Sequence, residues 1–273
     1  MTTQPTAFVL SYERPIFLWA TLDSLWRNTK LGVRFVLLDN ASQDPAVRQV
    51  IEGFDSRGMF DEIEWGTTND PLRTQKAIAA RRGDLGERFF FVENDVIVPD
   101  TVCWASEYEA IAAEDPKAGM IGSFCDPADF PDPEKVRALH PNSSSKEIAF
   151  LAKSNSPERS FILQPGMRVW PNPDQHPPGR LVRLSTEAID RVGYCADREL
   201  GRRMRAVGLT TKVCTTFQHR HLSLLNAYDL NDEIYAEKRK AFFVAMNADD
   251  TPAGRYNRIA KIFQRGLRPI GRR

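Results

Sequence analysis

The sequence lacks three features that are typical of membrane or secreted proteins. Its 273 residues contain no apolar run near the roughly 20 residues that cross a bilayer. Residues 1–5 lack the basic and then apolar segments of a secretory signal. The four cysteines are widely spaced and include no CxxC pair, which argues against a zinc site and against a disulfide framework. We therefore expect a cytoplasmic protein with reduced thiols.

Acidic residues are missing from residues 254–273, although the whole chain balances 37 Lys and Arg against 36 Asp and Glu. Apolar residues recur in this segment at helical spacing, with arginine and lysine between them. The pattern predicts a basic helical tail, 246–273. Three roles stay open for it: binding an anionic membrane, which would place the protein peripherally at the inner face, binding nucleic acid, or docking on the main domain with a solvated end.

The rest of the chain alternates strand and helix patterns. Four short apolar runs predict strands in the first hundred residues, at 7–10, 33–38, 63–65 and 89–92. Helical patterns lie between them, so right-handed crossovers should build a mainly parallel sheet. We predict an α/β fold with a mixed, mainly parallel central sheet flanked by helices, and with C-terminal helices at 233–246 and 255–267. Residues 1–245 form one domain in this prediction, with halves at 1–98 and 99–245.

The most informative segment is 89–95, in which an apolar run ends in Glu93-Asn94-Asp95. A buried strand reads as such a run, and open α/β sheets bind ligands at the carboxyl ends of their strands. Two carboxylates this close repel each other unless a positive group lies beside them, and a divalent cation with a phosphate ligand supplies one. A strand that ends in a turn is the alternative, because Asn and Asp are also turn residues.

Polar residues also follow two other predicted strands, at 11–14 and 39–40. Strands of one parallel sheet end at one edge, so these clusters should converge with 93–95. Three separate turns would not require that convergence.

Two later segments extend the pattern. Residues 196–203 read A-D-R-E-L-G-R-R and are followed by Gly208, and His219 stands just after a predicted strand at 211–216. Together with S-Y-E-R-P at 11–15, D-N-A-S-Q-D at 39–44 and E-N-D at 93–95, they resemble, in order, the motifs of nucleotide-sugar glycosyltransferases with the GT-A fold. The resemblance is closest to glycosyltransferase family 2. Ala196 departs from it by replacing a carboxylate, and Glu13 departs from it by replacing an asparagine.

The resemblance implies a metal-dependent, inverting glycosyltransferase. The half at 1–98 would bind the nucleotide sugar, most commonly a UDP-sugar, and the half at 99–245 would bind the acceptor. Asp95 is implied as a direct metal ligand and His219 as a second, with Mn²⁺, or Mg²⁺, as the ion. His221 could replace His219, because H-x-H places both side chains on one face of a strand. A strand-end histidine bonded to a backbone carbonyl is the alternative.

The same resemblance implies a set of nucleotide-sugar contacts. Asp39 would accept hydrogen bonds from the base or ribose, and Glu93 would contact the ribose or a metal-bound water. The alternative for Asp39 is an Asx turn before the helix that begins at Pro45. The full set is Ser11, Glu13, Arg14, Asp39, Asn40, Arg73, Lys76, Glu93 and Asn94, in which the three basic residues are candidates for the diphosphate.

Asp197 is the implied general base, which would take the proton of an acceptor hydroxyl as it attacks the anomeric carbon. Attack opposite the leaving group inverts that carbon. Glu199 is the competing base, and Asp197 is alternatively a helix N-cap. Trp170 is a candidate for stacking on an acceptor sugar, with a place in the core as the alternative.

The acceptor class stays open among a saccharide, a lipid-linked glycan and a modified DNA base. A sugar-phosphate nucleotidyltransferase is a rival, but that class has a glycine-rich loop after its first strand, and residues 11–15 contain no glycine. A non-catalytic module that binds nucleic acid or membrane through the basic tail is the second rival.

Overall fold

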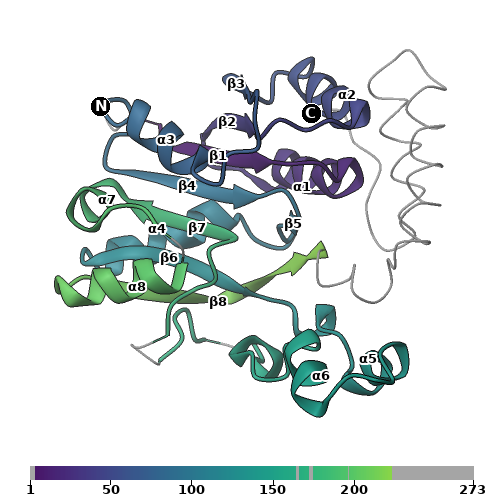
Figure 1. The fold of residues 1–273 in the computed structure, drawn as a ribbon. Coiled ribbons are helices and arrows are strands. Elements are labelled where there is room, and N and C mark those ends of the chain that lie inside the picture. The colour runs from purple at the N-terminus through teal and green to yellow at the C-terminus, as the bar shows by residue number, and fades with distance from the viewer. Residues whose placement is uncertain (1–3, 164–165, 172–174, 196, 223–273) are drawn as a thin grey trace.

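The computed structural model describes residues 4–163, 166–171, 175–195 and 197–222 (Figure 1). The predicted helices at 233–246 and 255–267 and the basic tail at 246–273 lie outside the described residues. Within the described part, the strands form one eight-stranded sheet in the order β3-β2-β1-β4-β7-β6-β8-β5.

The first four strands are parallel and lie where the apolar runs predict them. They are β1 (Thr6–Ser11), β2 (Arg34–Asp39), β3 (Glu62–Trp65) and β4 (Arg88–Glu93), with β1 between β2 and β4. The crossovers contain α1 (Pro15–Asn28), α2 (Pro45–Asp55) and α3 (Arg73–Ala80). Proline begins α1 and α2, where its fixed φ suits the first turn and its missing N–H costs nothing. This arrangement confirms the predicted α/β class.

The second half makes the sheet mixed. Strand β7 (Leu181–Ser185) runs antiparallel between β4 and β6 (Ala118–Cys125), and β8 (Thr210–His221) is parallel to β6. The short β5 (Val96–Ile97) pairs antiparallel with the end of β8. Strand β8 continues five residues past the predicted end at 216, because β5 and β6 supply backbone partners up to His221.

Helices cover both faces of the sheet, and alternate residues of each strand enter two separate cores. One core packs α1, α2 and α4 (Trp104–Glu114) against residues such as Val9 and Phe90. The other packs α3, α7 (Thr186–Val192) and α8 (Asp197–Ala206) against residues such as Phe8 and Phe91. This period of two is what a sheet buried on both faces requires. None of the described helices is long and apolar enough to cross a membrane.

An insertion between β6 and β7 contains the short elements η1 (Pro127–Asp129), α5 (Pro133–Leu139), α6 (Ser145–Leu151) and η2 (Pro157–Ser160). In Figure 1, α5 and α6 lie together beyond the end of β6. Each of the four begins at an Asp or Ser whose side chain accepts a backbone N–H, the usual N-cap arrangement. The insertion brings η1 and η2 to the carboxyl edge of the sheet, next to the polar strand ends.

Candidate functional site

Loops at the carboxyl ends of β1 and β2 are joined by hydrogen bonds around Ser42. Its N–H and hydroxyl donate to the two carboxylate oxygens of Asp39, at 3.0 and 2.6 Å, and its Oγ accepts the N–H of Glu13 at 2.9 Å. The carboxylate of Glu13 accepts the N–H groups of Gln43 and Asp44, at 2.6 and 3.2 Å. Glu13 therefore connects the two loops just before α2, whose N-cap is Asp44, and Asp39 has the Asx-type contacts considered as an alternative.

Three non-glycine residues in these loops adopt left-handed backbone angles, with φ of 52° at Glu13, 55° at Arg14 and 67° at Ala41. Such angles cost on the order of 1–2 kcal/mol for a residue with a Cβ. They persist where surrounding contacts over-determine the backbone, and they cluster at functional sites. The hydrogen bonds through Ser42 and Glu13 provide that constraint.

The two asparagines extend the network to neighbouring loops. The Asn40 amide donates to Asn69 at 2.7 Å, and its carbonyl accepts the N–H of Asp70 at 2.9 Å. The Asn94 amide donates to the carbonyl of Tyr12 at 3.2 Å. The loops after β1, β2, β3 and β4 are thus connected at one edge, and the predicted convergence of the strand ends is present in the structure.

Three side chains of the types that bind metal ions meet at this edge. One ligand atom each of Glu93, Asp95 and His221 lies within 4.8 Å of the others. Nε2 of His221 is 3.3 Å from Oδ2 of Asp95, and the N–H of Leu222 donates to the carbonyl of Asp95 at 2.8 Å. Two carboxylates and an imidazole form a donor set that suits Mn²⁺, with Mg²⁺ as a harder alternative.

His219 lies behind this cluster. It is fully buried, and its Nδ1 is 2.9 Å from the hydroxyl of Ser123, which Tyr108 also contacts at 2.9 Å. Burial, with smaller contributions from the positive charges of Arg180 and His221, lowers the pKa of His219 well below its usual value. Its buried Nε2 has no hydrogen-bond partner among the described residues. The structure thus places His221, rather than the predicted His219, in contact with Asp95.

The three basic residues predicted to contact the diphosphate have different ion-pair partners. Nη1 of Arg14 is 4.0 Å from Oδ2 of Asp95, so this side chain borders the cluster. Arg73 pairs with Glu64 at 3.1 Å. Lys76 pairs with Asp70 at 2.7 Å, and the Lys76 side chain is 68% exposed. Arg73 and Lys76 belong to α3, and their ion pairs within the described part of the chain are with Glu64 and Asp70 rather than with the cluster.

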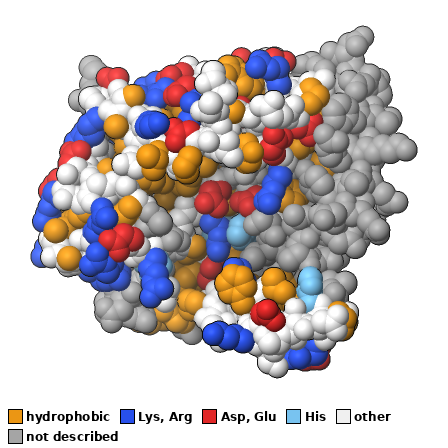
Figure 2. All heavy atoms as spheres, in the orientation of Figure 1, with side chains coloured by type: hydrophobic (Ala, Val, Ile, Leu, Met, Phe, Trp, Pro, Cys, Tyr) orange, Lys and Arg blue, Asp and Glu red, His pale blue; other side chains and the backbone are white. Residues whose placement is uncertain are grey.

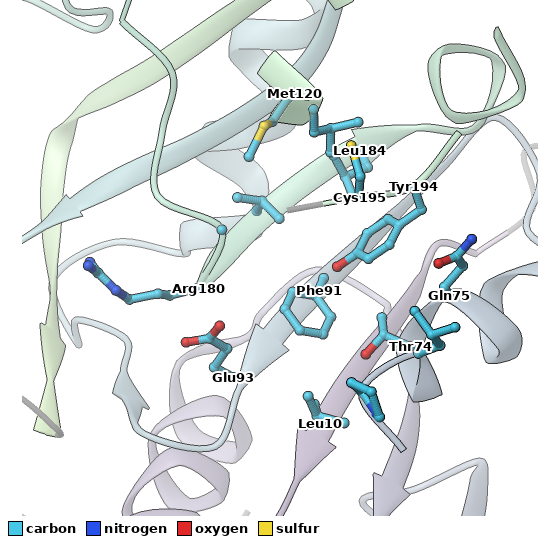
Figure 3. A pocket seen from close by; sticks show the side chains of 15 residues that line it. Leu10, Thr74, Gln75, Phe91, Glu93, Met120, Arg180, Leu184, Tyr194 and Cys195 are labelled. Carbon is cyan, nitrogen blue, oxygen red and sulfur yellow. The ribbon is translucent and has the colours of Figure 1, made fainter. Parts of the chain in front are cut away.

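A cavity of about 450 Å³ begins at Glu93 and runs across the sheet face (Figure 3). Arg180 lies beside Glu93 at one end, Thr74 and Gln75 of α3 line one side, and Tyr194 lines the other. The wall is otherwise mostly apolar, from residues such as Leu10, Phe91, Val182, Leu184 and Leu200. Figure 2 shows acidic, basic and histidine side chains together in a hollow of the molecular surface.

Two buried carboxylates of the insertion contact the residues around the cluster. Asp129 of η1 accepts the backbone N–H of His221 at 2.8 Å and the Nε–H of Arg220 at 2.6 Å. Glu158 of η2 accepts the N–H of Cys125 at 2.8 Å and pairs with Nη1 of Arg180 at 3.2 Å. Sequence reasoning missed these contacts. Only the N-cap spacing of Ser156 and Glu158 marks a local turn there, and it does not indicate a site.

The predicted bases are both on α8. Asp197 is its first residue, between the cavity-lining residues Cys195 and Leu200, and its side chain lies outside the described part. Glu199 pairs with Arg202 and Arg203 at 2.7 and 2.8 Å, and these hydrogen bonds, Arg202 first, lower the pKa of Glu199 to about 2. A carboxylate with so low a pKa is a weak proton acceptor.

Trp170 is half-buried in a small aromatic cluster. Its ring lies 5.1 Å from that of Phe161 and 6.3 Å from that of Phe124, and both pairs are edge-to-face. The backbone N–H of Trp170 donates to the backbone carbonyl of Val213 in β8 at 2.9 Å. It does not line the cavity that begins at Glu93.

No family model matches the sequence, and no curated protein matches it either. Solved structures match the fold. GalNAc-T7, in a crystal structure with UDP, GalNAc and Mn²⁺, is 12% identical with a TM-score of 0.52, over 92% of this chain and 52% of that one. TarS of S. aureus is 12% identical with a TM-score of 0.51, over 96% of this chain and 43% of that one. This chain therefore spans about half the length of those proteins.

At 12% identity, these matches establish the fold. They confirm the predicted GT-A-like architecture, in which a mixed sheet presents its parallel strand ends to one site. By its fold, this chain is a GT-A-like α/β protein, and its site is a cluster of two carboxylates and a histidine at the end of β4.

Proposed function

We propose that this protein transfers a sugar from a nucleoside-diphosphate sugar, a UDP-sugar being the first candidate, to an acceptor hydroxyl. The meeting of Glu93, Asp95 and His221 at the end of β4 carries this proposal. His221 is more than 120 positions away from Glu93 and Asp95 in the sequence, and a structural turn needs no histidine from a distant strand. The GT-A-like fold supports it, and the matched GalNAc-T7 structure contains UDP and Mn²⁺.

Donor binding is assigned to the connected loops after β1, β2 and β4. Asp39, Asn40 and Ser11 lie at adjacent parallel strand ends, where nucleotides bind in open α/β sheets. The left-handed backbone at Glu13 and Arg14 places the N-terminal end of α1 beside Asp95. Arg73 and Lys76 would contact the nucleotide only after exchanging their carboxylate partners, so we rank them below Arg14.

The cluster fits a divalent cation, and Asp95 and His221 are the proposed ligands, with Glu93 in direct contact or in contact through water. His219 is the alternative ligand, because its buried Nε2 has no hydrogen-bond partner in the described part of the chain and its lowered pKa favours the neutral ring. When bound, Mn²⁺ or Mg²⁺ would neutralise the charge of the departing diphosphate without proton transfer. Asp129 would orient His221 through its backbone N–H, as outer-shell carboxylates orient metal ligands.

Asp197 is the proposed base for the acceptor hydroxyl. Cys195 and Leu200 on either side of it line the cavity that begins at Glu93, so the start of α8 faces the same space as the donor site. Proton transfer to Asp197 would accompany attack on the face opposite the leaving diphosphate, with inversion. Glu199 is the weaker candidate, because two arginines hold its pKa at about 2.

The acceptor remains one of a saccharide, a lipid-linked glycan or a modified DNA base. The half at 99–245 would bind it, with Trp170 as a candidate contact at the edge of the insertion. The basic tail at 246–273 would then hold the protein near a membrane or a nucleic acid.

A donor-hydrolysis screen tests the proposal. Purified protein is incubated with UDP- and GDP-sugars, with and without Mn²⁺, and nucleotide release is measured. We expect release from one donor that depends on Mn²⁺ and is abolished by Asp95→Asn. Asp190→Asn is the matched control, because Asp190 is a half-exposed carboxylate of α7 that pairs with Arg82 and belongs neither to the cluster nor to the cavity lining. Absence of release and of nucleotide binding across the whole panel would refute the proposal.

A further inference from the structure

Arg180 is the cationic side chain that the structure adds to the donor site. Its backbone carbonyl accepts the N–H of Glu93 at 2.8 Å, so it lies directly beside the end of β4. Its side chain lines the cavity next to Glu93 (Figure 3). The next lining residues of the same segment are Val182 and Leu184, whereas Arg183 between them pairs with Glu109 of α4 at 3.0 Å.

The guanidinium of Arg180 is held by one carboxylate. Glu158 contacts its Nη1 with both oxygens, at 3.3 and 3.2 Å, and the side chains are 20% and 8% exposed. Glu158 is itself fixed by the N–H of Cys125 at 2.8 Å. Within the described part of the chain, the hydrogen bonds of the Arg180 guanidinium are made by Nη1. The N–H groups of Nε and Nη2 are therefore available for a ligand.

Charge indicates which ligand fits. Burial opposes the charged form of Arg180, but attraction to Glu158 and, more weakly, to Glu93 outweighs it and raises the pKa of Arg180. A permanent positive charge beside a cation site weakens cation binding unless an anion lies between the two charges. A planar guanidinium with free N–H groups pairs well with phosphate oxygens.

We propose that Arg180, held in place by Glu158, binds the diphosphate of the donor from the side opposite the divalent cation. This inference rests on the proposed function, since it assigns one more contact within that donor site. The insertion then acts on the donor through Glu158, which is more than 60 residues away from Glu93 in the sequence.

The test separates cation binding from nucleotide binding. Titration calorimetry measures Mn²⁺ alone, and then UDP and GDP at saturating Mn²⁺, for the wild type and Arg180→Gln. We expect nucleotide affinity to fall about 10-fold to 100-fold, which corresponds to one charge-assisted hydrogen bond. Affinity for Mn²⁺ alone should stay the same or rise, because Glu93 loses a positive neighbour. A purely structural role would instead weaken both.

Two further variants control for folding. Arg180→Gln leaves Glu158 buried without its partner, so the double variant Arg180→Gln/Glu158→Gln removes both charges and should show the same nucleotide loss. Arg183→Gln removes a similarly buried arginine from the other face of β7 and should leave both affinities unchanged.

Each outcome decides the proposal. The proposal is overturned if the Arg180 variants bind nucleotide within about 5-fold of the wild-type affinity, because losing one charged hydrogen bond should cost more than that. The proposed function would then still stand. A parallel loss of Mn²⁺ affinity also overturns the proposal for Arg180. Failure of the wild type to bind either nucleotide with Mn²⁺ overturns the proposed function and this inference together.

Discussion

The proposed metal histidine is the most directly testable assignment, because His219 and His221 are two residues apart in β8 and, of the two, His221 contacts Asp95. Nε2 of His221 is 3.3 Å from Asp95, whereas Nδ1 of His219 is bonded to Ser123. We expect His221→Gln to lose Mn²⁺ binding with little change in stability. His219→Gln should lose stability, by about 1–3 kcal/mol, because it leaves a buried hydroxyl network without its ring partner, and it should retain Mn²⁺ binding.

The size of the effect follows from linkage. A ligand present at 100 times its dissociation constant stabilises the folded state by about 2.7 kcal/mol. Losing an outer-shell partner of a metal ligand already costs about 10-fold to 100-fold in affinity, so we take about 100-fold as the minimum for losing a ligand. At the same Mn²⁺ concentration, the stabilisation of His221→Gln then falls to about 0.4 kcal/mol.

Thermal unfolding with and without Mn²⁺ measures this difference. For a chain of this size, about 2.7 kcal/mol corresponds to a Tm increase of roughly 5–11 °C, and about 0.4 kcal/mol to 1–2 °C. His219→Gln should start from a lower Tm and still show the full increase. If His219→Gln abolished the increase and His221→Gln retained it, the assignment of the two histidines would be reversed.

Three further predictions concern the loop after β2, the base and the core. Gly66→Ala should cost about 1–3 kcal/mol in urea unfolding and weaken UDP binding, because its Cβ would lie 2.6 Å from the carbonyl oxygen of Asp39; unchanged UDP affinity would contradict this. Glu199→Gln should keep more than half of the transfer rate, since its carboxylate has a pKa of about 2 and two arginine partners, and a loss of more than 100-fold would make it the base. Burial, partly offset by Arg27, raises the pKa of Asp23 to about 6. The stability that protonated Asp23 contributes is therefore complete below about pH 4 and is lost as the pH rises through 6, a change of up to about 3 kcal/mol. Urea unfolding from pH 4 to 7 should show this slope in the wild type and not in Asp23→Asn, and parallel curves would refute it.

Much of the fold could be predicted because the signals are local. The apolar runs that form β1, β2 and β4 are continuous, which is typical of strands buried on both faces. Proline at the start of α1 and α2 marks those helices directly. The antiparallel pairing of β7 could not be predicted, since the short segment L-V-R-L-S does not reveal that it lies between β4 and β6.

The strand-end residues of the candidate site could be predicted from the sequence, but the contacts that their side chains make could not. Parallel strands end at one edge, so the location of Asp39 and Asp95 at the same edge follows from the order of elements. Glu13 lies in the predicted place, but its carboxylate binds the backbone of the loop before α2, and this contact depends on the left-handed turn at Glu13 itself. No periodicity in the sequence indicates such a turn at a glutamate.

By itself, the sequence determined the α/β class, the strand ends that carry polar groups and the acidic pair at 93–95, because each depends on residues within one element. Only the tertiary structure placed His221 rather than His219 beside Asp95 and brought Arg180 to Glu93. The two histidines share one face of β8, so their difference comes from the pairing of β8 with β5 and β6. Arg180 and Glu158 meet because the insertion folds back on the sheet edge, and such long-range contacts leave no periodic trace in the sequence.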